Sequence, residues 1–255
     1  MANSINTNYG ANVALQTLNA TNKALATTQN RVSTGQAVSS AKDNGAIFAI
    51  ATNQRAEMSA LGSVKQSLQR GQSIVDVALA AGDTVVEALT EMKALAVAIE
   101  AGGSTATLAA LNADYAAKQT EITNALAGAK FDGANLFTAT AVDVITDTSG
   151  TEITLGGTAV TATPASATAA AVQTTIEAFT TTMATLGTKS KQLERATTFT
   201  GKMQDALEAG VGNLVDADLA KESARLTALQ TKQQLGVQAL SIANSSSSIL
   251  LGLFR

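Results

Sequence analysis

The sequence predicts a mainly α-helical protein, with a long antiparallel helical rod, coiled-coil helices at both termini and a small β-hairpin region. Three observations support this fold class. Both ends of the chain carry apolar residues in alternating steps of four and three, which is the spacing of a coiled-coil seam. Long segments between the ends keep a helical periodicity over many turns. Residues 141–155 instead alternate with a period of two, as a half-buried strand does.

The N-terminal stretch is expected to form a helix over residues 5–33 that ends near Gly35. Residues 1–22 contain no charge. A walk in steps of four and three gives a seam through Ala11, Leu15, Leu18, Asn22, Leu25, Gln29 and Val32. A polar loop is predicted to follow at residues 36–45.

The rod is predicted from two long periodic segments. The first begins after the polar loop and ends at a Gly-rich break at residues 101–104. A shorter helix is then predicted over residues 105–127. Within the first segment Asp76 and Asp83 lie one heptad apart, which indicates an exposed acidic stripe.

The β-hairpin is predicted from two alternating runs on either side of a turn at residues 147–150. Val142 and Val144 on the first strand can face Ile153 and Leu155 on the second. A Thr- and Ala-rich tail then leads back to the helices.

The second rod helix is expected to start at Ala169 and to end near Gly210 and Gly212. We interpret this Gly-x-Gly pair as a hinge between two helices. It lacks the rest of a dinucleotide-binding fingerprint and does not follow a strand.

The C-terminal stretch, residues 216–255, is predicted to be a helix that needs partners. Steps of four and three from Val215 give a seam that is mainly apolar with a few polar residues. Its members are Leu219, Glu222, Leu226, Leu229, Gln233, Gly236, Leu240, Ala243, Ser247, Leu250 and Phe254. A second apolar face begins at Leu235, and no charge lies between Gln233 and Phe254. A helix that is apolar on two faces is expected to be buried in protein.

Two uncharged ends that each carry a seam are expected to pair with one another. Asn22 and Gln29 on one helix and Gln233 on the other should fix the register, because polar seam residues favour one alignment at a cost in stability. The charge-free C-terminal run is long enough for a membrane span, but the serines at 245–248 would lack hydrogen-bond partners in hydrocarbon. We therefore expect no membrane insertion.

Composition excludes several kinds of chemistry. The 255 residues include no Cys and no His, so disulfides, thiol nucleophiles and His-based catalysis are absent. The net charge of -3 without a basic stripe gives no reason to expect nucleic acid as a partner. Asp216 and Asp218 suit a helix start better than a metal site, and the Ser190–Lys191 pair has no oxyanion element beside it. We expect no enzyme activity, metal or cofactor.

Separated motifs, in the right order, resemble those of bacterial flagellins over nearly all of the chain. Toward the N-terminus they are Asn6-Thr7-Asn8, the Arg-hydrophobic-Ser-x-Gly pattern from Arg31 to Gly35, and Ser40-Ala41-Lys42-Asp43. In the middle they are Leu95-Ala96-Val97 and Phe131-Asp132-Gly133. Toward the C-terminus they are Asp218-Leu219-Ala220-x-Glu222, Gln238-Ala239-Leu240 and Ile249-Leu250-Leu251.

The resemblance implies a secreted, extracellular subunit of the bacterial flagellar filament, which self-assembles into a helical homopolymer for motility. It assigns residues 1–35 and 214–255 to a terminal coiled-coil core that forms an inner tube, and 36–45 to a connecting loop. Residues 46–130 and 169–213 would form the rod, and 131–168 the surface-exposed hairpin region. The self-assembly seam is expected to comprise Leu15, Leu18, Leu25, Val32, Leu219, Leu226, Leu229, Leu240, Leu250 and Phe254.

Further partners are implied by the same resemblance. They are a flagellin export chaperone on the C-terminal helix, the filament cap, the hook–filament junction proteins and the flagellar type III export apparatus. The lack of a Sec-type signal agrees with export by that apparatus. Two alternatives remain at this point, a hook–filament junction protein and, from another class, a helical signalling module of the chemoreceptor type.

One motif departs from the family. In flagellins that a host Toll-like receptor detects, the first long helix carries Leu-Gln-Arg-x-x-Glu-Leu. Here the aligned residues are Leu89, Thr90, Glu91, Ala94 and Leu95, so the basic position is acidic and the acidic position is apolar. We expect weak or absent activation of that receptor, because like charges that face each other across an interface are unfavourable.

Overall fold

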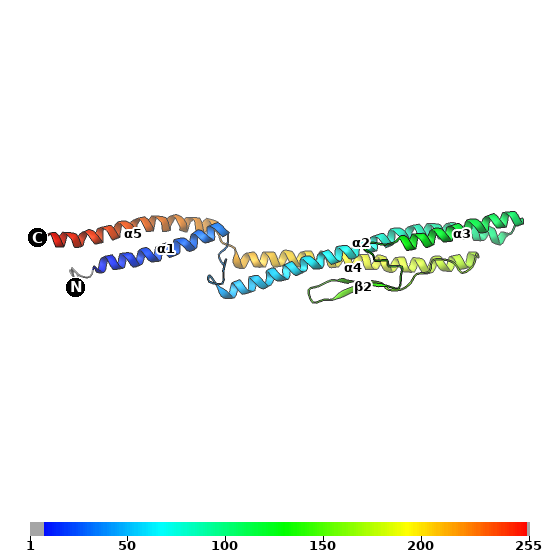
Figure 1. Ribbon diagram of the computed structural model, residues 1–255, viewed down its shortest axis with the longest axis horizontal. Helices are drawn as coiled ribbons and strands as arrows, with labels where there is room; N and C mark the ends of the chain where they lie inside the picture. The colour runs from blue at the N-terminus through cyan, green and yellow to red at the C-terminus, as the bar shows by residue number, and fades with distance from the viewer. Residues whose placement is uncertain (1–7, 254–255) are drawn as a thin grey trace. The chain divides into compact units, whose positions relative to one another are not determined.

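The computed structural model describes residues 8–253, with side chains up to residue 245. Its elements are α1 (Tyr9–Thr34), α2 (Gly45–Ala101), α3 (Thr105–Gly128), β1 (Ala141–Ile145), β2 (Glu152–Gly156), α4 (Ala169–Val215) and α5 (Leu219–Leu253) (Figure 1). The described chain forms two compact units. The terminal unit contains residues 8–55 and 207–253, and the central unit contains Ala56–Ala206. The predicted fold class, mainly α with a small β-hairpin, is confirmed.

The ends of α1 show how local sequence sets a helix boundary. The side-chain oxygen of Asn8 accepts a hydrogen bond from the amide of Ala11 at 3.0 Å, which satisfies a free N–H of the first turn. At the other end Gly35 adopts φ 71° and donates to the carbonyl of Arg31 at 2.9 Å. This left-handed conformation favours glycine and ends the helix where the sequence predicted. The predicted residues 5–7 lie outside the described residues.

The hinge predicted at Gly210 and Gly212 is wrong. Helix α4 runs through both glycines to Val215, and neither has a positive φ. A glycine inside a helix costs only about 1 kcal/mol relative to alanine, so packing on either side can hold it there. The break falls at residues 216–218, and α5 therefore begins at Leu219 rather than at residue 216.

In the central unit, α2 and α4 pack antiparallel. The side-chain amide of Gln72 donates to Ser190 Oγ at 2.7 Å, and Lys93 Nζ donates to Gln173 Oε1 at 2.7 Å. Between these two contacts the Met183 side chain fills the space that a Cβ on Gly82 would occupy. The absence of a side chain at position 82 thus gives the end of the Met183 side chain its place between the two helices.

The core of the central unit is continuous. Helices α2, α3 and α4 contribute side chains that are almost fully removed from solvent, among them Leu89, Ile122 and Leu193. The rings of Phe137 and Phe179 lie 5.7 Å apart between centroids, which joins the segment after α3 to α4. Each fully buried aliphatic side chain contributes about 1.5–3 kcal/mol, so this unit has a substantial hydrophobic core of its own.

The predicted hairpin is confirmed. Strands β1 and β2 pair antiparallel, with Val142 opposite Leu155 and Val144 opposite Ile153. The hairpin packs on α2, where the Val144 side chain lies only 2.7 Å from the point that a Cβ on Gly71 would occupy. On the inward face Val144 and Leu155 are buried and Val142 and Ile153 partly buried, as the alternating pattern predicted.

Candidate functional site

The predicted pairing of the two terminal helices is present within the terminal unit. Asn8 Nδ2 donates to the carbonyl of Ala243 at 2.7 Å, and near the other end Arg31 Nη1 lies 3.2 Å from Glu222 Oε1. Because residues early in α1 contact residues late in α5, the helices are antiparallel, and they lie side by side in Figure 1.

Two of the three polar seam residues contact each other as the sequence predicted. Gln233 Nε2 donates to Asn22 Oδ1 at 2.8 Å, whereas Gln29 is exposed. One turn away, a Cβ on Gly236 would lie 3.2 Å from Cδ1 of Leu18, so the small residue allows close approach. This polar pair and this notch each fit one alignment of α1 on α5 better than its neighbours.

The seam on α5 follows the predicted steps of four and three. Partly buried side chains recur at Leu226, Leu229, Gln233, Gly236, Leu240 and Ala243. Leu219 departs from the pattern, since it is 50% exposed. The side chain of Leu250 lies outside the described side chains, and Phe254 lies outside the described residues.

On α1 the predicted seam is only half right. Leu18, Leu25 and Val32 are partly buried in the α1–α5 pair, but Leu15 is 46% exposed. The intervening positions that turn toward the partner are Ala14, Thr21 and Thr28, one residue earlier than the predicted Leu15, Asn22 and Gln29. Steps of three and four reach either set, and the threonines fit because the Thr21 hydroxyl donates to the carbonyl of Thr17 at 2.9 Å.

The two chain segments that follow α1 and precede α5 are bound to each other by their backbones. The amides of Ala37 and Val38 donate to the carbonyl of Val215 at 2.7 and 3.3 Å, and the amide of Ala217 donates to that of Gly35 at 2.9 Å. These bonds, together with the Arg31–Glu222 ion pair, bring the motif from Arg31 to Gly35 and the motif from Asp218 to Glu222 into one cluster. The cluster was not predicted, because backbone pairing between distant residues leaves no sequence signal.

Two acidic side chains cap turns in this cluster. Asp43 accepts hydrogen bonds from the hydroxyl and amide of Ser40 at 3.0 Å each and from Ser39, and these bonds lower the pKa of its carboxyl. Asp218 Oδ1 accepts from the amides of Ala220 and Lys221, which confirms its interpretation as a residue of the helix start.

Part of the surface of the α1–α5 pair is apolar and exposed. Leu235, Val237 and Ile242 on α5 are 59, 54 and 70% exposed, and Tyr9 and Val13 on α1 are also exposed. Exposed apolar side chains on both helices, outside their shared seam, are typical of a surface that binds other protein.

The altered receptor motif lies in the central unit. Leu89 is fully buried and Leu95 partly so, whereas Thr90, Glu91 and Ala94 are exposed. Glu91 lies 2.6 Å from Lys118 of α3, and Lys118 also contacts Glu121. The Glu91 and Glu121 carboxylates together raise the pKa of the Lys118 ammonium well above its usual value.

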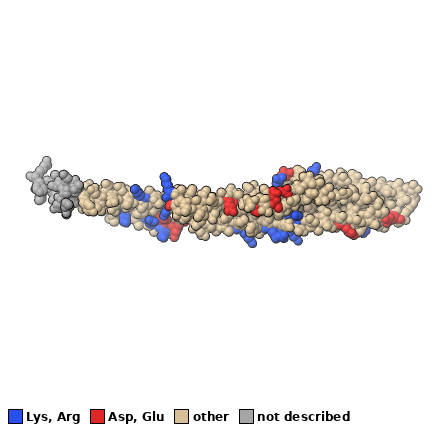
Figure 2. All heavy atoms as spheres, turned by 90° about the horizontal axis from the view of Figure 1, so that it is seen from below, with Lys and Arg blue, Asp and Glu red and all other residues tan. Residues whose placement is uncertain are grey.

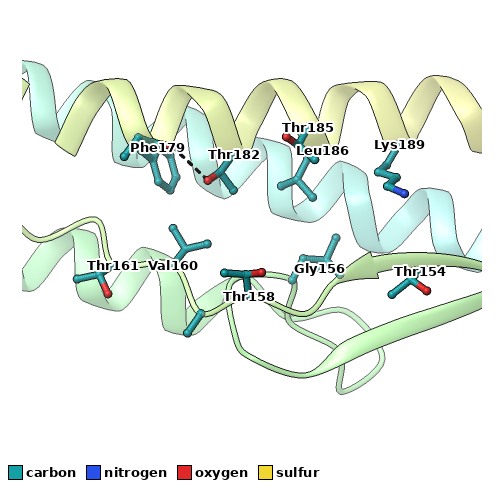
Figure 3. Close-up of a pocket in the computed structure, with 13 residues that line it drawn as sticks. Thr154, Gly156, Thr158, Val160, Thr161, Phe179, Thr182, Thr185, Leu186 and Lys189 are labelled. Atoms are coloured by element: carbon teal, nitrogen blue, oxygen red, sulfur yellow. Dashed lines mark hydrogen bonds between the residues drawn. The ribbon is translucent and has the colours of Figure 1, made fainter. Parts of the chain in front are cut away.

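A pocket of about 380 Å³ lies between α4 and the segment that contains and follows β2. Figure 3 shows Lys189 and Thr154 at one end of it and Phe179 and Thr161 at the other. Its lining combines threonine hydroxyls with apolar side chains, and it holds no pair of titratable groups for acid–base catalysis. Among residues 8–253, no group of three or more acidic residues could hold a metal ion, and no helix is long and apolar enough to cross a membrane.

Two conserved regions of one protein family match this chain, one in its N-terminal part and one in its C-terminal part. The bacterial flagellin N-terminal helical region matches residues 5–141, and the C-terminal helical region matches residues 169–254. This chain belongs to the bacterial flagellin family. It is 51% identical to flagellin FljO and 50% identical to flagellin FljK of Caulobacter vibrioides, over 99% of both chains in each case. It is 39% identical to a flagellin of Brucella melitensis, again over 99% of both chains.

Membership decides between the interpretations that the sequence left open. This flagellin is a subunit of the extracellular flagellar filament, a structural protein of motility without enzymatic activity, and it polymerises with copies of itself. The hook–filament junction protein and the helical signalling module are therefore set aside.

Proposed function

We propose that the α1–α5 pair forms the inner tube of the filament and that neighbouring copies cover its exposed apolar side chains. The observation that carries this proposal is the exposure of Leu235, Val237 and Ile242 on a helix whose seam is already occupied by α1. Burying such side chains in a neighbour gains about 1.5–3 kcal/mol each. In this proposal residues 1–35 and 214–255 form the core, 46–130 and 169–213 the rod, and 131–168 the outer surface.

Polymerisation of purified variants tests this assignment. Ile242→Ser removes an apolar side chain that is 70% exposed, so it leaves the free chain almost unchanged. If neighbours bury the residue, the critical concentration for polymerisation rises about tenfold or more, since 1.4 kcal/mol is a factor of ten. Gln238→Ser on the same helix is the matched control, because it exchanges one exposed polar side chain for another. Equal critical concentrations for both variants would contradict the proposal.

The same exposed face on α5 suits a role before assembly. We assign it to the flagellin export chaperone, which would shield Leu235 and Ile242 until export through the type III apparatus, with the cap and the junction proteins acting at the filament ends. Binding of that chaperone to the full chain, and its loss when the chain ends at residue 234, is the expected result. Undiminished binding to the shortened chain would place the chaperone elsewhere.

A second proposal concerns the host receptor. The exposed Glu91 and Ala94 stand where receptor-active flagellins carry Arg and Glu, and Glu91 is engaged by Lys118 at 2.6 Å. A receptor surface that is complementary to Arg therefore meets a carboxylate, and one charged hydrogen bond is missing at position 94. We expect weak or no activation by this flagellin.

A reporter assay with free monomers tests the receptor proposal. Glu91→Arg combined with Ala94→Glu should restore activation in part. Lys118→Gln is the control that frees Glu91 from its ion pair without restoring the motif, and it should stay inactive. Activation by the unaltered chain at the level of a flagellin with the full motif would refute the proposal.

A further inference from the structure

An acidic stripe runs along the outer face of α2 in the central unit. Asp76, Ala80, Asp83 and Glu87 follow one another in steps of four, three and four, and all four are exposed. Residues on the other side of the helix, such as Val75 and Val85, are fully buried. The stripe extends the acidic pair at Asp76 and Asp83 that the sequence indicated.

A basic stripe runs along the outer face of α4. Lys191, Arg195, Phe199 and Lys202 follow one another in steps of four, four and three, and all are exposed, Phe199 by 63%. Leu193 and Thr200 lie on the opposite, buried side. Phe199 is the most exposed of the large apolar side chains described in the central unit, and aromatic residues and arginine are enriched at protein–protein interfaces.

The charged residues of the two stripes are without ionic partners in the described part of the chain. The ion pairs found there are Arg31 with Glu222, Arg70 with Asp132, and Lys118 with Glu91 and Glu121. Charged residues make up only 15% of the sequence, and Figure 2 shows them sparse on the face it presents. The charges of the two rows are thus not neutralised by ion pairs within the described part of the chain, and they are distinguished from other unpaired charges by their ordered spacing.

The spacing of the two rows is complementary when the helices run antiparallel. From Lys191 the basic row steps by four and then by seven, and from Glu87 the acidic row steps back by four and then by seven. Each row spans 11 residues, or about 17 Å at the helical rise of 1.5 Å. The pairs that result are Lys191 with Glu87, Arg195 with Asp83, and Lys202 with Asp76. In this alignment the Phe199 ring falls within one residue of the small, exposed Ala80.

Within one chain the two stripes do not meet in this register. Helices α2 and α4 pack with Gln72 at Ser190 and Gly82 at Met183, so Lys191 lies near the level of Gln72 and several helical turns from Glu87. Because α2 and α4 are antiparallel within a subunit, α2 of one subunit is also antiparallel to α4 of a neighbour in the same orientation. Two different surfaces that meet in this way form a heterologous contact, which propagates into rings or helical filaments.

We infer that the acidic stripe of one subunit binds the basic stripe of the next, with Phe199 seated on Ala80, as a lateral contact of the filament. This inference rests on the self-assembly of the chain, and it adds a contact in the central unit to those of the terminal helices. Charge complementarity fixes which neighbour surface is bound and in which register.

Charge reversal tests the contact. Asp83→Lys makes the acidic stripe less acidic while the basic stripe stays basic, and Arg195→Glu does the opposite. Each variant alone should raise the critical concentration at least tenfold. An equimolar mixture of the two variants should polymerise again, because each then meets the complementary charge on the other. The double variant within one chain should also recover.

The controls separate this contact from other causes. Asp143→Lys and Lys130→Glu reverse exposed charges elsewhere in the central unit and should polymerise like the unaltered chain. Circular dichroism of each monomer checks that the helices are retained. Normal polymerisation of either single variant, or failure of the mixture while the unaltered chain polymerises, would overturn the inference. Failure of the unaltered chain itself would instead count against self-assembly.

Discussion

In the central unit, apolar side chains from three helices and a hairpin meet in one continuous core, whereas in the terminal unit α1 and α5 share a narrow seam and leave apolar side chains outside. Leu89, Ile122, Phe179 and Leu193 are almost fully buried in the first. In the α1–α5 pair of the second, the buried positions include Thr21, Thr28 and Glu222.

The difference indicates where each unit obtains its stability. A pair of helices with one shared seam buries little apolar surface, while ordering its backbone costs roughly 1–2 kcal/mol per residue. The central unit can offset that cost within one chain. The terminal unit is expected to do so only when neighbouring subunits cover its outer faces, so folding of the terminal helices and assembly become one process.

The largest expected effect separates assembly from folding. Leu240→Asp places a charge in the α1–α5 seam, where it has no partner and loses its hydration. Polymerisation should be abolished while the thermal unfolding of the central unit stays unchanged. Leu240→Met, which conserves volume and polarity, is the control and should polymerise. Sedimentation and calorimetry measure the two outcomes, and filaments of the Asp variant would break the distinction between the units.

A smaller effect is expected on the stability of the central unit. Gly71→Ala puts a methyl group 2.7 Å from Cγ2 of Val144, a branched side chain that has little freedom to move, and overpacking of this kind costs about 1–3 kcal/mol. Gly187→Ala in α4 is the matched control, because nothing lies within 4 Å of its added Cβ. It should stabilise by about 0.5–1 kcal/mol through helix propensity. Opposite shifts in the unfolding temperature are expected, and shifts of the same sign would contradict the packing described.

The smallest effect compares one carboxyl in each unit. The pKa of Asp43 is lowered by Ser40, and that of Asp147 in the hairpin turn by Thr151. A folded pKa below the unfolded value stabilises the fold above the unfolded pKa, and this contribution is lost as the pH falls through the folded pKa. Titration followed by NMR should show the pKa of Asp147 depressed below 3.8 in the free chain. The pKa of Asp43 should also be lowered there, because its hydrogen bonds come from Ser39 and Ser40 of the same turn. An unshifted pKa of Asp43 in the free chain would show that this turn forms only on assembly.

The elements best predicted from sequence are those in which a repeating pattern has a single interpretation. The α5 seam was found because every step from Leu226 to Ala243 places a compatible residue on one face. The hairpin was found because Val142 and Val144 on one strand, and Ile153 and Leu155 on the other, alternate with polar residues around a turn.

The α1 seam was half wrong for a physical reason. Leu18, Leu25 and Val32 are common to two seams, and apolarity at Leu15 favoured the wrong one. A threonine that bonds its hydroxyl to its own helix is buried at little cost, so burial follows packing size there rather than hydropathy. The hinge predicted at Gly210 and Gly212 was wrong because a sequence does not reveal whether a glycine adopts a positive φ.

Hydrogen exchange on the free chain and on the filament tests most directly whether the two units differ in where they obtain their stability. We expect amides of the central-unit core, such as those of Leu89 and Leu193, to be strongly protected in both states. Amides of α5 from Leu235 to Ser245 should exchange rapidly in the free chain and become protected only in the filament. Equal, high protection of residues 235–245 in the free chain would contradict this coupling of folding to assembly.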